Sequence, residues 1–225
     1  MELTEPFGNL KCDAMKIPAE IQSFHFANTT VQAYIPSHKW IQRQFDKEEQ
    51  NSPVPYWAQV WPAAKALCEI IAMQPALVEN KKVIELAAGL GLPSLLAAQF
   101  AKEVSAGDYI PAAVEIMNRS VKYNKIKNMR CAVMDWNKLD KKLNPDVLLL
   151  SDINYDPKSF TVLYKVLTDF IEKGTTVLLS TPQRLIAKTF MNRLQPWCRE
   201  AYQIEIKHKE EIISTSVWLL QKEKH

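Results

Sequence analysis

The sequence VIELAAGLGLPSLLAAQF, residues 83–100, decides the fold of this chain. A strand-like run from Val83 leads into the glycine turn Ala87–Gly91, and a helix is predicted over Leu92–Ala101. The chain has only five glycines, and two of them lie in this turn. Glycine permits unusual backbone angles, and the free N–H groups at a helix start can donate to a polar ligand. The turn therefore indicates a ligand site, although an ordinary tight strand–helix turn would also fit it.

The segments around this unit alternate between strand and helix patterns. Strands are predicted at Val83–Ala87, Glu103–Gly107, Cys131–Met134, Asp146–Ser151 and Thr175–Ser180. Helices are predicted at Pro62–Met73, Leu92–Ala101, Pro111–Asn124, Phe160–Glu172 and Leu185–Leu194. This alternation predicts βαβ units, in which helices cover both faces of a parallel sheet. The last two strands, Tyr202–Lys207 and Ile213–Leu220, are joined by a link too short for a crossover helix and should be antiparallel.

We therefore predict a Rossmann-like, doubly wound α/β fold with a mostly parallel seven-stranded sheet that ends in an antiparallel C-terminal strand pair. A small β-hairpin is predicted over Ser23–Ile35, where β-branched and aromatic residues alternate. Residues 1–20 are expected to form a loosely attached arm, and the polar residues 42–52 an exposed connection. The predicted domains are an N-terminal extension, 1–52, and a main domain, 53–225.

The composition argues against several classes of protein. The 225 residues carry a net charge of +3 without a basic stripe, which argues against extended nucleic-acid binding. No apolar stretch reaches the ~18 residues of a membrane span, and the N-terminus lacks the pattern of a signal peptide. The four cysteines lack metal-site spacing and are expected to be reduced thiols: Cys12, Cys68, Cys131 and Cys198. We expect a cytoplasmic enzyme or binding protein without a metal, and nothing in the sequence indicates an oligomeric state.

Acidic and aromatic residues follow the predicted strands, at the edge where open α/β sheets bind ligands. Asp108 lies 17 residues after Gly91, where a carboxylate can accept hydrogen bonds from both hydroxyls of a ribose. NAD enzymes use the same arrangement, so these two residues do not choose a cofactor. At Asp135–Trp136 the acid can accept a hydrogen bond from an adenine amino group, and the indole can cover the ring. The polar cluster SDINYD, residues 151–156, follows a buried apolar run and indicates binding at the same edge.

Together these segments resemble the methyltransferase family that contains the seven-β-strand protein-lysine methyltransferases and the nicotinamide N-methyltransferase-like proteins. The matching segments are PYWAQVWPAA (55–64), VIELAAGLGLPSLLAA (83–98), GDYIPAAVEIMNRSVKYN (107–124), MDW (134–136) and SDINYD (151–156). Their order and spacing agree over residues 53–182. One position departs from the family pattern, because Ala87 stands where the first glycine of the turn is usual. An alanine fits there if the backbone angle stays in an allowed region.

The resemblance implies S-adenosylmethionine as the cofactor and assigns roles to individual residues. The residues assigned to the cofactor are Trp61, Glu85, Ala87, Gly89, Gly91, Asp108, Tyr109, Asp135, Trp136 and Ser151. Ala87–Gly91 would hold the methionine part of the cofactor, Asp108 its ribose and Trp136 its adenine. Asp152 and Tyr155 have the Asp-x-x-Tyr form common among lysine-modifying members, and they would line the opening to the acceptor as the catalytic pair.

Methyl transfer from a sulfonium requires the protein mainly to position the acceptor and exclude water. Asp152 could orient an amine acceptor, Tyr155 could accept a hydrogen bond from it or pack beside it, and Tyr56 and Trp57 could favour a cationic amine. Arg184 is expected to be a surface arginine, with contact to an acidic partner as the alternative.

The working hypothesis is N-methylation of a protein lysine or a related amine. A small-molecule methyltransferase and a non-catalytic cofactor-binding module are the alternatives. The sequence SDINY differs from the Asn-Pro-Pro-Tyr motif that grips a flipped base, which argues against a nucleic-acid acceptor.

Overall fold

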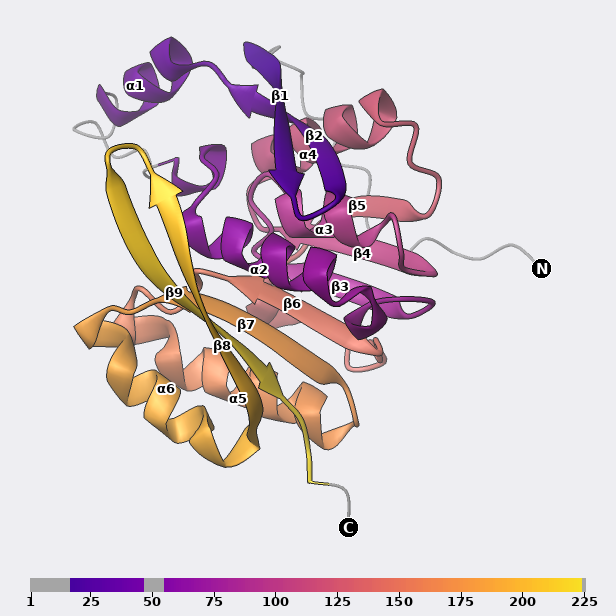
Figure 1. Cartoon of the computed structure of the whole chain (residues 1–225), viewed down its shortest axis with the longest axis vertical. Coiled ribbons are helices and arrows are strands. Elements are labelled where there is room, and N and C mark those ends of the chain that lie inside the picture. Colours follow the sequence, from indigo (N-terminus) through magenta and orange to yellow (C-terminus); the bar gives the residue numbers. More distant parts are fainter. Residues whose placement is uncertain (1–16, 47–54, 224–225) are drawn as a thin grey trace.

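The computed structural model describes residues 17–46 and 55–223, which contain a seven-stranded sheet with helices on both faces (Figure 1). The strands lie in the order β5-β4-β3-β6-β7-β9-β8. Their bounds are β3 Lys82–Leu86, β4 Glu103–Asp108, β5 Met129–Val133, β6 Val147–Ser151, β7 Thr176–Pro182, β8 Cys198–His208 and β9 Glu211–Leu220. Strands β3 to β7 pair in parallel, whereas β9 is antiparallel to both β7 and β8. The predicted mixed sheet is confirmed.

The helices alternate with the parallel strands as predicted. The α-helices of the described segments are α1 His38–Asp46, α2 Pro62–Met73, α3 Leu92–Ala97, α4 Pro111–Tyr123, α5 Phe160–Glu172 and α6 Lys188–Leu194. Short 3-10 turns are η2 Tyr56–Ala58, η3 Pro75–Leu77, η4 Trp136–Lys138, η5 Pro157–Ser159, η6 Leu185–Ala187 and η7 Gln195–Trp197. No helix within 17–46 or 55–223 is long and apolar enough to cross a membrane.

The central strands are buried on both faces and separate two layers of core. In β6, Val147 and Leu149 belong to a cluster with residues of α2, α3 and α4. Leu148 and Leu150 belong to the opposite cluster, with residues of α5 and α6. Because successive side chains of a strand point to opposite faces, a strand covered on both sides is apolar throughout. The parallel strands β4, β3 and β6 are neighbours, so their carboxyl ends lie side by side at one edge of the sheet.

A two-stranded hairpin, β1 Ala19–Phe26 and β2 Thr29–Pro36, precedes the sheet and confirms the predicted β-hairpin. The predicted loose arm is wrong from residue 17 onwards, because Ile17 is buried and β1 begins at Ala19. Over residues 42–46 the predicted connection is wrong, because these residues form the second half of α1. Gln42, Arg43 and Asp46 are nevertheless exposed, as predicted. Residues 1–16 and 47–52 of these two predictions lie outside the described residues.

The hairpin is attached to helix α4 by hydrogen bonds from both sides. The Tyr34 N–H donates to the Ser120 hydroxyl at 2.9 Å, and the Asn124 side-chain amide donates to the Gln32 carbonyl at 2.7 Å. The Arg119 guanidinium lies 4.5 Å from the centre of the Tyr34 ring, a favourable cation–π position. The hairpin therefore rests on the same helix that follows strand β4.

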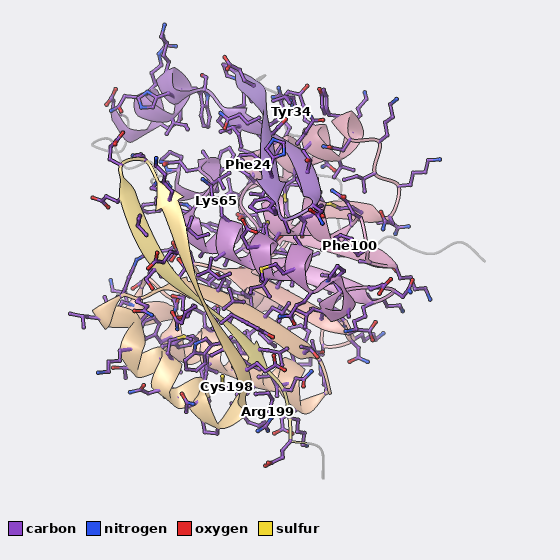
Figure 2. The ribbon with its side chains drawn as sticks, viewed as in Figure 1. Phe24, Tyr34, Lys65, Phe100, Cys198 and Arg199 are labelled. Atoms are coloured by element: carbon purple, nitrogen blue, oxygen red, sulfur yellow. The ribbon has the colours of Figure 1, made fainter. Side chains whose placement is uncertain are left out.

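The hairpin also supports the turn that decides the fold. Leu90, within the glycine turn, forms a small buried cluster with Ile17 and Ile116. Tyr34 and Trp57 pack partly against this cluster. Figure 2 shows Tyr34 on the hairpin, above the core helices. The N-terminal extension is therefore part of the packing behind the turn.

Helix α3 ends at Ala97, before the predicted Ala101. The Asn128 side-chain amide donates to the carbonyl groups of Ala98 and Ala101, at 2.9 Å each. The bond to Ala98 satisfies the carbonyl group of the residue that caps the helix, and the bond to Ala101 fixes the turn that follows it. Phe100 lies in the turn that follows and packs partly against the core (Figure 2). The predicted helix Leu185–Leu194 is likewise shorter, because its first turn is the 3-10 turn η6.

We predict that Ser120→Ala destabilises the fold by about 1–2 kcal/mol, because the Tyr34 N–H would lose its acceptor in a partly buried contact. Chemical denaturation measures the change in unfolding free energy. Asn118→Ala, on the exposed side of α4, is the matched control and should change stability by less than about 0.5 kcal/mol. A Ser120→Ala protein as stable as the parent would show that the hairpin does not depend on this contact.

Candidate functional site

A cavity of about 420 Å³, which we call the site cavity, opens at the carboxyl ends of β3, β4 and β6. This volume is typical of small-molecule sites. The sequence-predicted residues that line it are Tyr56, Trp57, Trp61, Ala87–Gly91, Asp108, Tyr109, Trp136, Ser151, Asp152 and Tyr155. Glu85 and Asp135 do not line it. Over the described ranges, no group of three or more His, Cys, Asp or Glu side chains is placed to hold a metal ion.

The glycine turn has left-handed backbone at three positions, with φ of 51° at Ala87, 56° at Gly89 and 69° at Gly91. Glycine adopts this conformation freely. A Cβ on Gly89 would also lie 3.1 Å from the Trp57 carbonyl oxygen, so this position needs glycine for space as well. Ala87 adopts the small left-handed region that a side chain tolerates, at a cost of about 1–2 kcal/mol.

Glu85 lies beneath the turn, fully buried, rather than in the cavity wall. One oxygen of its carboxyl group accepts hydrogen bonds from the Ser94 N–H at 3.0 Å and from the Ser94 hydroxyl at 2.6 Å. Burial raises the pKa of Glu85 from 4.5 to about 8, although the hydrogen bonds from Ser94 act against this rise. Because Ser94 lies in the first turn of α3, Glu85 fixes the point at which the glycine turn enters the helix.

Asp108, at the end of β4, both holds the turn and faces the cavity. One carboxylate oxygen accepts the Gly89 N–H and the other accepts the Ile110 N–H, at 2.9 Å each. Burial raises the pKa of Asp108, and the backbone N–H groups of Ile110, Gly89 and Tyr109 partly offset this rise. Since the two carboxylate oxygens have four lone pairs between them, the carboxylate can still accept a hydrogen bond from a ligand.

Trp136 lines the cavity, but the neighbouring Asp135 is occupied by its own turn. The Asp135 carboxylate accepts the backbone N–H of Asn137 at 2.9 Å and its side-chain amide at 2.8 Å. These hydrogen bonds lower the pKa of Asp135. Asp135 therefore caps the 3-10 turn η4, which carries Trp136, and its contact with an adenine amino group stays a prediction.

The loop after β6 brings Asp152 and Tyr155 to the cavity together. The Asp152 side chain accepts two hydrogen bonds from the Arg184 guanidinium, at 2.7 and 3.0 Å. Burial raises the pKa of Asp152, and the adjacent charge and hydrogen bonds of Arg184 partly offset this rise. Arg184 is exposed, as expected, but its pairing with Asp152 within the chain was not predicted.

An aromatic rim surrounds the opening beside Asp152. The Tyr155 ring is half exposed and its centre lies 5.9 Å from that of Tyr56, which lies 6.3 Å from that of Trp61. The Trp61 indole N–H donates to the Tyr56 carbonyl at 2.8 Å, which fixes the two residues relative to each other. Burial, with the nearby Tyr109, raises the pKa of the Tyr155 hydroxyl, so this hydroxyl stays protonated at neutral pH.

Several residues of the cavity wall were not predicted as site residues: Gln59, Val60, Ala64, Leu92, Ile110 and Ile153. Gln59, Val60 and Ala64 belong to the quoted segment PYWAQVWPAA, and Ile110 and Ile153 follow the predicted acidic residues by one or two positions. Closeness to a strand end is therefore the signal that could have found the two isoleucines.

We predict that Ala87→Gly stabilises the fold by about 0.5–1 kcal/mol, because it removes the Cβ from a left-handed position. The unfolding free energy from chemical denaturation measures the gain. Ala88→Gly is the matched control. Since Ala88 has no positive φ, this variant should have an unfolding free energy lower by about 0.5–1 kcal/mol. A loss of stability in Ala87→Gly would mean that the methyl group of Ala87 contributes packing that outweighs its strain.

The raised pKa of Glu85 predicts that the fold becomes less stable with rising pH. Between pH 4.5 and about 8 the folded protein holds a proton on Glu85 that the unfolded chain releases, so the stability due to this group falls through that window. We expect the unfolding free energy of Glu85→Gln to rise relative to that of the parent by up to about 1.4 kcal/mol per pH unit across this window. Denaturation at several pH values measures this difference.

The test is how the stability difference between parent and Glu85→Gln changes with pH. Its absolute size is not a test, because the amide can shift stability equally at all pH values. Glu79→Gln, at an exposed position, controls for the loss of a surface carboxyl group. A difference between parent and Glu85→Gln that does not vary from pH 4.5 to 8 would contradict a proton held on Glu85.

Known proteins are similar to this chain in sequence. A family profile described as lysine methyltransferase matches residues 42–197. EEF1A lysine methyltransferase 3 of Mus musculus is 30% identical over 168 residues, which cover 72% of this chain and 70% of that protein. Histone-arginine methyltransferase METTL23 of Xenopus laevis is 28% identical over 152 residues, which cover 65% of this chain and 62% of that protein.

A solved structure supports the fold. The N-methyltransferase NodS of Bradyrhizobium japonicum WM9, in complex with S-adenosyl-L-homocysteine, aligns with a TM-score of 0.59 over 80% of this chain and 98% of that chain. At 11% identity, this likeness concerns the fold alone. The profile match over more than half of the chain agrees with the seven-stranded sheet and the cavity at its carboxyl edge, and the chain belongs to the lysine methyltransferase family.

Proposed function

We propose that this chain is an S-adenosylmethionine-dependent methyltransferase that methylates a lysine or a related amine of an acceptor protein. The observation that carries the proposal is the single cavity that Asp108, Asp152 and Tyr155 line together. In this proposal Asp108 would hold the ribose, and Asp152 would meet the acceptor behind the aromatic rim. Membership of the lysine methyltransferase family supports the proposal.

The residues of the cavity wall fit the parts of the cofactor. Beside its hydrogen bonds to the backbone, the Asp108 carboxylate can still accept one from a ribose hydroxyl. The left-handed turn Ala87–Gly91 allows the methionine part to approach the backbone. Trp136 offers its ring to the adenine, and Glu85 contributes from beneath by holding the turn. The remaining proposed contacts are those of Trp61, Tyr109 and Ser151, with Asp135 beside the adenine.

The cofactor, when bound, supplies a methyl group on a sulfonium, so that attack by an amine nitrogen forms a C–N bond, breaks the C–S bond and releases a proton. The chain then has to hold the nitrogen in line and exclude water. The Asp152 carboxylate accepts a hydrogen bond from the nitrogen, while the Tyr155 hydroxyl donates or accepts one beside it. The aromatic rim of Tyr56, Trp61 and Tyr155 favours a cationic or methylated amine at the opening.

The acceptor is proposed to be a protein because the relatives named above are described by protein acceptors, EEF1A and histone. The half-exposed rings of Tyr56 and Tyr155 place the opening at the surface, where a protein side chain can reach it. A small-molecule amine is the second candidate acceptor. The division into an extension, 1–52, and a methyltransferase domain, 53–225, and a cytoplasmic location are kept as parts of the proposal.

We predict that Asp108→Ala weakens S-adenosylmethionine binding by about tenfold or more, because the ribose loses its charged hydrogen-bond acceptor and the turn loses its anchor. Calorimetric titration of parent and variant measures the affinity. Asp156→Ala is the control, since Asp156 is exposed and does not line the cavity. Tight binding of NADH without binding of S-adenosylmethionine would reject the proposed cofactor.

We predict that Asp152→Asn lowers methyl transfer to protein by at least about tenfold, because the amide holds the acceptor nitrogen less well than a carboxylate. Methyl-labelled cofactor is incubated with a cell lysate, with purified EEF1A and with histones, and the protein and small-molecule fractions are counted separately. Asp156→Asn controls for the loss of a carboxylate in the same loop. Label found only in small molecules would contradict the protein acceptor.

A further inference from the structure

Arg184 lies between two cavities. Within the described residues it is the one side chain that lines both the site cavity and a second cavity of about 420 Å³. The second cavity is lined by residues of η6, α6, β8 and β9, among them Lys188, Gln203 and Trp218. The Arg184 side chain therefore has space on the side away from Asp152 as well as toward it.

The ion pair has one fixed partner and one partner with more freedom. The Asp152 side chain is 7% exposed and that of Arg184 is 38% exposed. The Asp152 backbone is held at φ 54°, and its N–H donates to the Ser180 carbonyl of the neighbouring strand β7 at 2.9 Å. Arg184 comes directly before η6, beside the almost fully exposed Leu185. If this pair opens, Arg184 is the side chain that moves.

Arg184 already occupies the Asp152 carboxylate, which the proposed function assigns to the acceptor. Both oxygens of Asp152 bind a cationic guanidinium, at 2.7 and 3.0 Å. A lysine ammonium arriving at the same carboxylate would meet the like charge of Arg184 at close range, which is unfavourable in a largely buried site. The two cations therefore compete for Asp152.

We propose that Arg184 is a specificity-determining residue: it occupies at Asp152 the place of the acceptor nitrogen, and it turns toward the second cavity when an amine enters. This inference rests on the proposed function, since it concerns the acceptor end of the same site. It makes Arg184 an internal competitor, which only a well-positioned amine displaces. The substrate class that it selects is a cationic side chain long enough to reach Asp152 past the aromatic rim.

The second cavity accepts the displaced side chain without neutralising it. Gln183 lines this cavity, and its amide oxygen can accept a guanidinium N–H group. The amide oxygen of Gln203 already accepts hydrogen bonds from the Gln183 side-chain amide at 2.7 Å and from the Ser216 hydroxyl at 3.2 Å. Lys188 lines it too and adds a second positive charge. Arg184 is therefore better paired at Asp152 than in the second cavity, so its displacement opposes acceptor binding. Removal of the guanidinium should strengthen the binding of an amine.

A small amine tests this competition without knowledge of the natural acceptor. n-Butylammonium, which mimics the end of a lysine side chain, is titrated into the protein with S-adenosylhomocysteine present. The carbon-13 signal of the Asp152 carboxyl group, identified by its loss in Asp152→Asn, reports binding at that residue. We expect Arg184→Ala to bind n-butylammonium at least fivefold more tightly than the parent.

Two further variants separate competition from loss of structure. Arg184→Lys keeps the charge but replaces the two-pronged contact by a single ammonium, so it should bind the probe about twofold more tightly than the parent. Arg184→Lys also tests the competition if Arg184→Ala does not fold. Arg193→Ala, which removes an arginine that lines neither cavity, should leave the affinity at the parent value. Thermal unfolding verifies that each variant is folded.

The outcomes distinguish this inference from the proposed function. Equal or weaker binding of n-butylammonium by both Arg184 variants overturns the competition, and so does absence of binding at Asp152 in every protein. Failure of the parent to label any protein or small molecule contradicts the proposed function, whatever the probe does. Labelled protein together with an unchanged probe affinity in the Arg184 variants rejects the role of Arg184 alone.

Discussion

The hydrogen bond from the Gly89 N–H to the Asp108 carboxylate is the contact on which the site cavity depends. It ties the turn after β3 to the end of β4, and Ile110 closes the link from the other side. Glu85 holds the far end of the same turn at Ser94. Burial of two neighbouring carboxyl groups raises both pKa values, and Asp108 adds to the rise at Glu85. The hydrogen bonds offset part of this cost and fix the turn before any ligand binds.

The fold could be predicted wherever packing leaves a local pattern. Strand β6 is apolar at every position because both faces are covered, and α5 shows its period because one side faces the sheet. The end of α3 has no such local signal, since it depends on the Asn128 amide from the loop before β5. The start of β1 at Ala19 is of the same kind, because it is set by pairing with Pro36. Distant partners, not weak propensities, account for these errors.

In the candidate site too, some features could be predicted from the sequence and others could not. Asp108, Trp136 and Asp152 could be placed because the carboxyl ends of parallel strands meet at one edge of a sheet. The side-chain partners could not be placed, because each depends on the folded structure. Arg184 reaches Asp152 across 32 positions of sequence, and the Glu85 side chain turns beneath the loop to Ser94. The sequence therefore located the acidic residues of the site without revealing which of them are occupied by the chain itself.

The hydrogen bonds that the acidic residues form within the chain bear on the choice of cofactor, since a glycine turn allows either S-adenosylmethionine or a dinucleotide. In dinucleotide sites the pyrophosphate lies on the N–H groups at the start of the helix after the turn. Here the Ser94 N–H, in the first turn of α3, already donates to Glu85, and the Gly89 N–H already donates to Asp108. A pyrophosphate would have to displace these carboxyl groups and would then lie beside the Asp108 carboxylate, which like charge disfavours. The sulfonium of the proposed cofactor needs no such donors, so the hydrogen bonds that shape the turn are compatible with S-adenosylmethionine and oppose a dinucleotide.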